Sequence, residues 1–293
     1  MHEVKRVGVI GAGQMGGGIA QVAAVAGFDT VVSDTTDAAV ERCKATHAKL
    51  LARAVEKGRM EQADADAASS RLTYAVGGAE ADGLSGADIV IEAVVEDAAV
   101  KAKVFSTLAK RFADPVILAT NTSSISITEI GAAASKAAAG ADARVIGMHF
   151  FYPVPVMQLV EVINGLATEE EVTKRVIALA EAMGKTALPA NDRAGFVSNR
   201  VLMPMINEAF YALMEGVAEP EAIDGIMKLG CNFPMGPLRL ADFIGLDTCA
   251  HIMDVLAEGL NSERYRPCPL LRQLVTAGRL GDKTGRGIFD HQK

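Results

Sequence analysis

The sequence predicts an α/β protein with a doubly wound, mostly parallel sheet over residues 1–190 and an all-helical domain over residues 191–293. Strand-like and helix-like segments alternate as far as about residue 190, which is typical of an open parallel sheet covered by helices. The first strand-like segment runs directly into a Gly-x-Gly-x-x-Gly turn. From about residue 195 the apolar residues recur at helical spacing instead, so a helical domain is expected there.

Short apolar runs mark the strands of the expected sheet. They are Val4–Ile10, Thr30–Asp34, Leu72–Val76, Ile89–Val95, Val116–Thr120, Arg144–Met148 and Leu159–Ile163. A long helix rich in Ala, Arg and Lys is expected between Thr36 and Lys57, with Asp37 near its start, where the helix dipole favours an acid.

The second domain begins with a long apolar stripe. Phe and Met residues recur at helical spacing between Phe196 and Met214, and Pro204 should kink that helix. Further helical segments are expected around Ala222–Leu229, Leu238–Ala257 and Leu270–Ala277. A linker near Pro189–Arg193 would join the two domains. We interpret the stripe as core or as the seam of a dimer.

The glycine turn after the first strand carries the most specific signal. It reads Gly11-Ala12-Gly13-Gln14-Met15-Gly16, and Asp34 ends the next strand. Gly11 permits a tight turn, Gly13 lets the backbone approach a pyrophosphate, and Gly16 lets helix and strand pack closely. Amides at the start of the following helix favour phosphate, and the Asp34 carboxylate would accept hydrogen bonds from ribose hydroxyls. Because a carboxylate repels a 2′-phosphate, we predict a Rossmann-type domain that binds NAD through Gly11, Gly13, Gln14, Met15, Gly16 and Asp34.

Composition argues against several classes of partner. The net charge is −7 without a basic cluster, so nucleic acid is not expected. No uncharged apolar stretch reads as a membrane helix, and no metal-ligand spacing occurs. The four cysteines lie far apart and favour a reduced, cytoplasmic protein. An acidic protein of this kind must bind anionic ligands with local positive groups and helix ends.

A histidine at the end of a strand is the leading catalytic candidate. His149 follows one strand, and Glu161 lies 12 residues later on the next. Ligands of doubly wound sheets bind beyond the carboxyl ends of the strands, so His149 and the segment Asn121–Ser124 should face the nicotinamide. Alcohol oxidation needs a base, which a neutral imidazole steadied by a carboxylate supplies near pH 7. A structural histidine packed by Phe is the plainer alternative. Three other histidines, which are not expected on a helix of the second domain, are interpreted as surface or terminal residues: His2, His47 and His291.

With these residues in place, the chain resembles the short-chain L-3-hydroxyacyl-CoA dehydrogenase family, and within it the bacterial 3-hydroxybutyryl-CoA dehydrogenases. The resemblance covers nearly the whole length. The matching segments are residues 11–16, 91–96, 121–125, 148–161, 195–200, 234–238 and 283–287.

The resemblance implies a homodimeric, NAD-dependent enzyme that interconverts an (S)-3-hydroxyacyl-CoA and a 3-oxoacyl-CoA. It implies that His149 is the base and Glu161 its partner, and that Ser123 and Asn199 meet the substrate oxygen. Implied cofactor contacts are Glu96, Lys101, Ser123, Tyr152 and Lys283. Lys57 would meet the CoA phosphates, and Arg53 lies four residues earlier on the same helix face, where it could help.

One departure from the family pattern leaves alternatives open. Tyr152 stands where the family usually has Asn directly after His-Phe-Phe. The phenol could replace the amide, or it could reshape the pocket. A dehydrogenase of a free hydroxy acid, of the sugar-acid or carnitine type, would use the same fold without Lys57. A catalytically impaired protein that binds NAD or CoA is the third reading.

Overall fold

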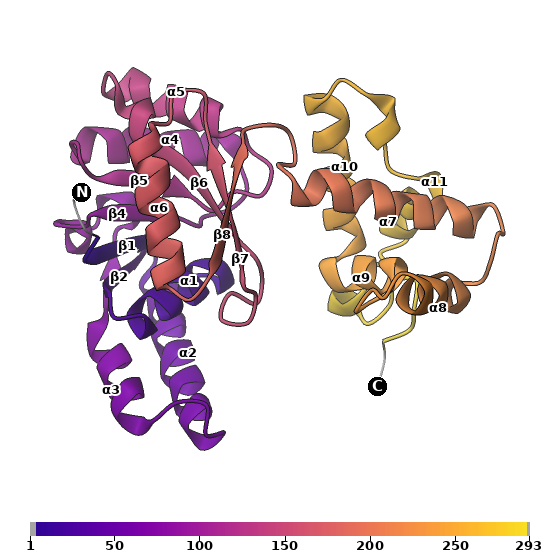
Figure 1. The fold of residues 1–293 in the computed structure, drawn as a ribbon, viewed down its shortest axis with the longest axis horizontal. Helices are drawn as coiled ribbons and strands as arrows, with labels where there is room; N and C mark the ends of the chain where they lie inside the picture. Colours follow the sequence, from indigo (N-terminus) through magenta and orange to yellow (C-terminus); the bar gives the residue numbers. More distant parts are fainter. Residues whose placement is uncertain (1–3, 292–293) are drawn as a thin grey trace. The chain divides into compact units, whose positions relative to one another are not determined.

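The computed structural model describes residues 4–291. It divides into two compact units, and the boundary between them in the sequence lies between Asp192 and Arg193. The first unit is a mostly parallel sheet with surrounding helices, and the second is helical (Figure 1). The fold class expected from the sequence is therefore confirmed.

The first unit is built on an eight-stranded sheet in the order β3-β2-β1-β4-β5-β6-β7-β8. The strands are β1 Arg6–Ile10, β2 Asp29–Asp34, β3 Leu72–Val76, β4 Ile89–Glu92, β5 Ile117–Thr120, β6 Val145–Phe150, β7 Leu159–Asn164 and β8 Thr186–Asn191. All neighbours are parallel except β6 and β7, which are antiparallel. The central strands β4, β5 and β6 are buried along their whole length, because helices cover both faces of such a sheet.

Over residues 4–192 this unit has six α-helices: α1 Gln14–Val25, α2 Asp37–Glu56, α3 Gln62–Arg71, α4 Ala98–Arg111, α5 Ile127–Ala137 and α6 Glu170–Ala182. Side-chain caps start three of them. Thr36 accepts from the amide of Ala39 at α2, Asp97 from Val100 at α4, and Ser126 from Glu129 at α5. Figure 1 shows α2 and α3 as a pair that extends away from the sheet.

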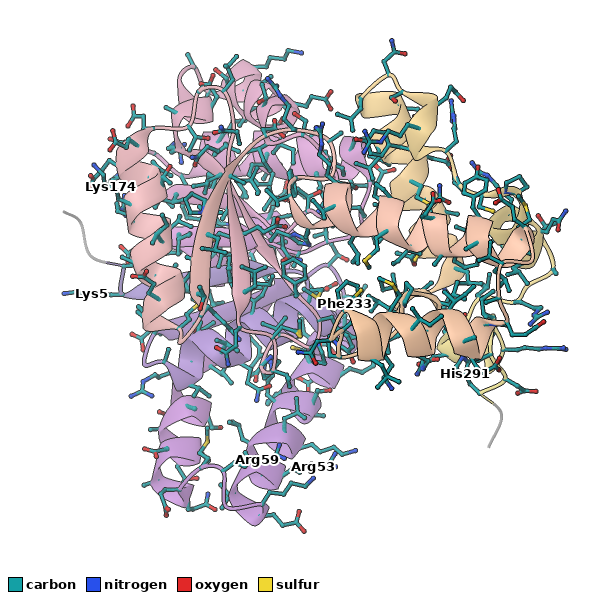
Figure 2. The ribbon with its side chains drawn as sticks, turned by 45° about the vertical axis from the view of Figure 1, so that its right-hand side comes forward. Lys5, Arg53, Arg59, Lys174, Phe233 and His291 are labelled. Carbon is teal, nitrogen blue, oxygen red and sulfur yellow. The ribbon has the colours of Figure 1, made fainter. Side chains whose placement is uncertain are left out.

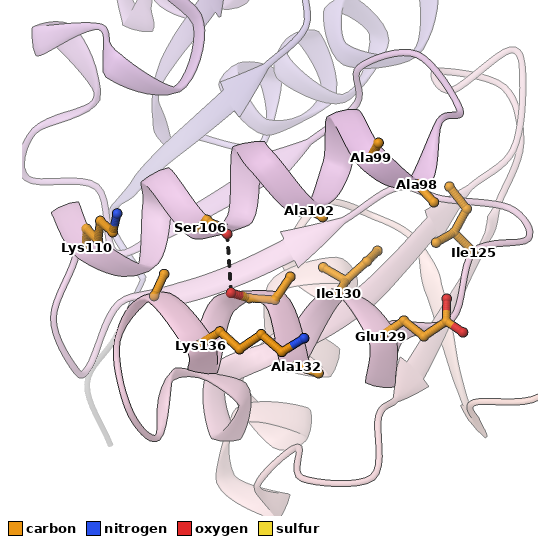
Figure 3. Close-up of a pocket in the computed structure, with 12 residues that line it drawn as sticks. Ala98, Ala99, Ala102, Ser106, Lys110, Ile125, Glu129, Ile130, Ala132 and Lys136 are labelled. Carbon is orange, nitrogen blue, oxygen red and sulfur yellow. Dashed lines mark hydrogen bonds between the residues drawn. The ribbon is translucent and has the colours of Figure 1, made fainter.

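Small residues let α4 and α5 lie close together. Ser106 Oγ donates to the carbonyl of Ala133 across the pair at 3.2 Å. A hollow of about 700 Å³ lies beside the pair, and six of its twelve lining residues are alanine (Figure 3). Its polar lining residues are Ser106, Lys110, Glu129 and Lys136, and none of the residues expected to act in catalysis or cofactor binding lines it.

In the second unit, as far as residue 291, five α-helices pack around an apolar core of their own. They are α7 Ser198–Met214, α8 Pro220–Gly230, α9 Pro237–Ile244, α10 Leu246–Gly259 and α11 Pro269–Thr276. Pro204 lies inside α7, which continues through it. The buried carboxylate of Asp242 accepts from the amides of Ile288 and Phe289, and so anchors the chain end to α9.

Three expectations from the sequence are wrong in detail. Pro189 belongs to β8 and not to a linker, because an edge strand tolerates the missing amide of proline. The helical segment Leu238–Ala257 is two helices, since Gly245 has φ of 104° between them. His47 is buried, with Nε2 2.8 Å from Gly17 O and Nδ1 2.8 Å from the Tyr74 hydroxyl. His291 is partly buried and bonds to Asp242, whereas His2 lies outside the described residues.

Candidate active site

The geometry of the turn between β1 and α1 accounts for the presence of glycine at each of its three positions. Gly11 has φ of 104°, and a Cβ there would collide with Ala93 O. A Cβ at Gly16 would collide with Gly11 O, so helix and strand approach too closely for any side chain. A Cβ at Gly13, in contrast, would meet no atom within 4 Å. The backbone at Gly13 is thus open to a ligand.

The first turn of α1 and the end of β2 complete this dinucleotide site. The first turn of α1 has no acidic residue, so its amides attract an anion. Asp34 Oδ2 accepts from the amide of Ala12 at 2.8 Å, and Oδ1 accepts from the amide of Thr35 at 2.7 Å. A carboxylate offers about four acceptor positions, so Asp34 retains capacity for ribose hydroxyls. The residues present fit NAD.

His149 and Glu161 are brought together by strand pairing. They are direct partners in the antiparallel ladder of β6 and β7. His149 Nδ1 lies 2.8 Å from Glu161 Oε2, and both side chains are buried. The ring of Phe151 packs on the imidazole with centroids 4.4 Å apart. The carboxylate favours the tautomer with the proton on Nδ1, which leaves Nε2 as a base.

The segment after β5 lies at the same edge of the sheet. Asn121 Oδ1 accepts from the amide of Phe150 at 2.9 Å, which ties this segment to the end of β6. The amide of Ser123 donates to Glu96 Oε1 at 2.8 Å, and the Ser123 hydroxyl lies 3.2 Å from the same oxygen. Ser123 is therefore held beside the carboxyl ends of β4, β5 and β6, where a ligand of this fold binds.

Glu96 and Lys101, both expected to contact the cofactor, lie in different surroundings. The Lys101 side chain is 1% exposed, and its ammonium lies 2.6 Å from Glu92 Oε1 and 3.3 Å from Glu96 Oε2. The Glu96 side chain is 32% exposed. Burial would raise the pKa of Glu96, but Lys101 and the hydrogen bonds from Thr122 and Ser123 lower it below its ordinary value. Lys101 reaches the Ser123 segment through Glu96.

A cavity of about 1140 Å³ lies between α1, α2, the segment 152–158 and residues 182–185 at the end of α6 and the turn after it. Ala12, Gly13 and Gln14 of the glycine turn line one part, and Tyr152, about half exposed, lines another. Its basic lining residues are Arg42, Arg53, Lys57, Arg59 and Lys185. Among the lining residues within 4–291 there is no Asp or Glu. The cavity is thus strongly positive in a chain whose net charge is −7.

The end of α2 concentrates three of these cations. Gly58, with φ of 63°, closes the helix, and the amide of Arg59 donates back to Ala54 O at 2.9 Å. This turn brings Arg59 back toward Arg53 and Lys57, and Figure 2 shows Arg53 and Arg59 near the free end of the α2–α3 pair. Cations are favoured at a helix C-terminus, which offsets part of the repulsion among these three charges.

Lys185 holds one wall of the cavity. Its Nζ donates to Val154 O at 2.6 Å and to Met157 O at 2.8 Å, and burial lowers its pKa. These bonds fix the segment that carries Tyr152.

Two expected site residues belong to the second unit. Asn199 lies buried in the first turn of α7. Lys283 Nζ lies 2.7 Å from Asp247 Oδ2, and this ion pair lowers the pKa of Asp247 although its partial burial raises it.

Sequence reasoning missed Glu92, Arg42, Arg59 and Lys185. The basic residues of α2 were a usable signal, because several lie on one helix and its closing turn. Glu92 and Lys185 had no local signal, since only the packing of distant segments gives them partners.

Other features limit the chemistry of the described residues. Residues 4–291 contain no group of three or more His, Cys, Asp or Glu side chains placed to hold a metal ion. In the same range, none of the helices has the length and apolar character to cross a membrane. All four cysteines are free thiols, and burial raises the pKa of Cys43 to about 11 and of Cys249 to about 12, so these two are poor nucleophiles.

Comparison with known proteins places these features in a family context. Residues 6–193 match the family model described as 3-hydroxyacyl-CoA dehydrogenase, NAD binding domain, and residues 195–291 match the C-terminal domain of the same enzymes. The chain is 55% identical to a probable 3-hydroxybutyryl-CoA dehydrogenase of Bacillus subtilis, over 99% of each chain. It is 48% identical to a 3-hydroxybutyryl-CoA dehydrogenase of Bradyrhizobium diazoefficiens, over 99% of this chain and 96% of that one. A crystal structure of (S)-3-hydroxybutyryl-CoA dehydrogenase from Ralstonia eutropha superposes with a TM-score of 0.94 at 47% identity, covering 99% of this chain and 100% of that one.

Proposed function

The chain belongs to the 3-hydroxyacyl-CoA dehydrogenase family, and from that premise we propose that it interconverts an (S)-3-hydroxyacyl-CoA and a 3-oxoacyl-CoA, with 3-hydroxybutyryl-CoA and acetoacetyl-CoA as the preferred pair. It is an NAD-dependent oxidoreductase. Bound NAD supplies the hydride acceptor. The names of the Bacillus subtilis and Ralstonia eutropha relatives support the four-carbon pair.

The positive cavity beside the glycine turn is the observation that carries the proposal. Coenzyme A carries three phosphate groups beside an adenine ring and a pantetheine chain, and binding it needs cations set among groups that pack on the ring and the chain. The cavity supplies Arg53, Lys57 and Arg59 together with Leu50 and Met60. A free hydroxy acid has one carboxylate and would not use so many cations. Charge complementarity therefore favours an acyl-CoA.

The reaction is assigned to groups at the sheet edge and to Asn199 of the second unit. His149 takes the hydroxyl proton of the substrate at Nε2, and Glu161 stabilises the imidazolium that forms. Ser123 and Asn199 donate hydrogen bonds to the substrate 3-oxygen. Positioned acid–base catalysis of this kind contributes about 10²–10⁴ in rate. The 2.8 Å bond from Nδ1 to Glu161 supports the assignment.

Cofactor binding is assigned to the glycine turn, Asp34, Glu96 and Lys283, with Tyr152 beside the nicotinamide. Lys101 acts on the cofactor through Glu96, as its buried ammonium suggests. Arg53 and Lys57 hold the CoA phosphates.

We also propose a homodimer in the cytoplasm. Val197 and Val201 on the α7 side, and Ile226 and Leu229 on α8, are exposed apolar pairs at helical spacing, which a second copy would cover. Four unpaired thiols are typical of a reducing compartment. Light scattering at micromolar concentration should give the mass of two chains, and a monomer would refute the dimer.

The test compares acetoacetyl-CoA with free acetoacetate, with NADH absorbance as the readout. We expect activity on the thioester, and Lys57→Ala should raise its KM about tenfold with kcat little changed. Lys44→Ala is the matched control, because Lys44 lies on α2 but outside the cavity lining and should leave KM unchanged. Equal kcat/KM for the free acid would favour the hydroxy-acid alternative. Binding of NADH without turnover of any 3-oxoacyl-CoA would favour the impaired one.

A further inference from the structure

Glu92 is a buried acid for which the proposed mechanism has no use. It ends β4, beside β1 and β5, and is 0% exposed. Its Oε1 accepts from Lys101 Nζ at 2.6 Å and from the amide of Val94 at 2.7 Å. Its Oε2 accepts from Thr120 Oγ1 at 2.7 Å. Both carboxylate oxygens are therefore satisfied within the protein.

Lys101 connects this acid to the Ser123 segment. Its ammonium is shared between Glu92 at 2.6 Å and Glu96 at 3.3 Å. Glu96 Oε1 in turn receives the Thr122 hydroxyl at 2.6 Å and the amides of Ser123 and Ser124 at 2.8 and 3.2 Å. Residues 122–124 thus all donate hydrogen bonds to one carboxylate oxygen, Glu96 Oε1.

Stability alone is a weak explanation for this arrangement. Burial of an ion costs several kcal/mol, and apolar residues of similar volume often replace a buried ion pair without loss of stability. What the pair does provide is position. Because Glu92 takes the shorter contact with Lys101, it keeps the ammonium from drawing Glu96 inward, and Glu96 Oε1 remains with the segment 122–124.

We propose that Glu92 is a positioning residue: through Lys101 it sets the place of the Glu96 carboxylate, and thereby the orientation of Ser123. This inference rests on the role proposed above for Ser123. A displacement of about 1 Å at a reacting group can cost about 10²-fold in rate, so the contact need not be direct.

A double-mutant cycle between Glu92 and Ser123 tests the inference. Glu92→Gln should lower kcat about 10- to 100-fold on acetoacetyl-CoA, measured at saturating NADH because Glu96 is also assigned to cofactor binding. In a Ser123→Ala background the same change should lower kcat by less than about threefold. Undiminished loss in that background would overturn the role of Glu92. If Ser123→Ala itself leaves kcat unchanged, the proposed function of Ser123 is what fails.

Two further variants keep the test sharp. Glu92→Gln with Lys101→Met removes both fully buried charges and leaves only the Glu96 carboxylate, whose side chain is 32% exposed, without its cation, so it should fold even if the single variant does not. If that variant has wild-type kcat, the proposal is wrong. Arg144→Met is the control for loss of a buried cation at the amino ends of β5 and β6, where Arg144 donates to Val116 O at 2.8 Å. It should lower the melting temperature, and its effect on kcat should be the same with and without Ser123.

Discussion

Glu161→Gln isolates the charge of the buried carboxylate from its shape. The side chain keeps its size and can still accept a hydrogen bond from His149 Nδ1, 2.8 Å away in the native pair. What it loses is the attraction to an imidazolium in the transition state. At 2.8 Å and an effective dielectric of about 20, two unit charges attract by about 6 kcal/mol.

Part of this attraction remains in the variant, because the amide oxygen retains a hydrogen bond of about 1 kcal/mol. Breaking a buried pair by removing one charge costs about 3–5 kcal/mol. At 1.36 kcal/mol per factor of ten, kcat should fall about 10²- to 10⁴-fold. The KM for (S)-3-hydroxybutyryl-CoA should hardly change, because in the direction of oxidation the charge on the imidazole develops only during the reaction.

The assay follows formation of NADH during oxidation of (S)-3-hydroxybutyryl-CoA, with NADH binding and the melting temperature measured on the same preparation. Glu170→Gln is the matched control, since Glu170 is exposed and pairs with Lys174 on the surface of α6. It should leave kcat unchanged. A Glu161→Gln protein that folds, binds NADH and keeps kcat within tenfold of wild type would refute the proposed role of the pair.

Three further predictions concern the turn, the pocket and stability. Gly13→Ala should leave the melting temperature unchanged, because its methyl meets no atom within 4 Å, but it should weaken NADH binding about tenfold or more, whereas Gly16→Ala should destabilise the fold by collision with Gly11 O. Calorimetry measures the change in stability, and fluorescence titration measures the change in NADH affinity. Wild-type NADH affinity in Gly13→Ala would contradict the assigned phosphate site. Tyr152→Asn should raise kcat/KM on acetoacetyl-CoA if the phenol obstructs the pocket, and unchanged kinetics would make it a neutral substitute. Burial lowers the pKa of His47 below 6.5, so the unfolded chain binds a proton that the folded chain does not, and stability falls as the pH drops below about 6.5. His47→Asn should flatten this dependence of the melting temperature on pH. If the melting temperatures of variant and wild type fall in parallel with pH, His47 is not the source.

Local patterns were sufficient for the framework of the site. The glycine turn, the strand that precedes it and the acid that ends β2 are contiguous features, so the backbone geometry they need is written in neighbouring residues. The pairing of His149 with Glu161 was also within reach, because two short strands in succession place residues 12 apart opposite each other. Strand β8 was not predicted, because it is an exposed edge strand that contains proline and therefore has no apolar run to mark it.

The sequence by itself determined the fold class, the dinucleotide turn and the main candidates for acid–base chemistry, because periodicity and glycine spacing act over a few residues. Only the tertiary structure decided that Lys101 is buried between Glu92 and Glu96, that His47 lies in the interior, and that Lys185 joins the arginines of α2 around one positive cavity. The burial of a side chain and its ion pairs depend on which distant segments pack together. The residues next to it in the sequence do not show which neighbours will shield it from water.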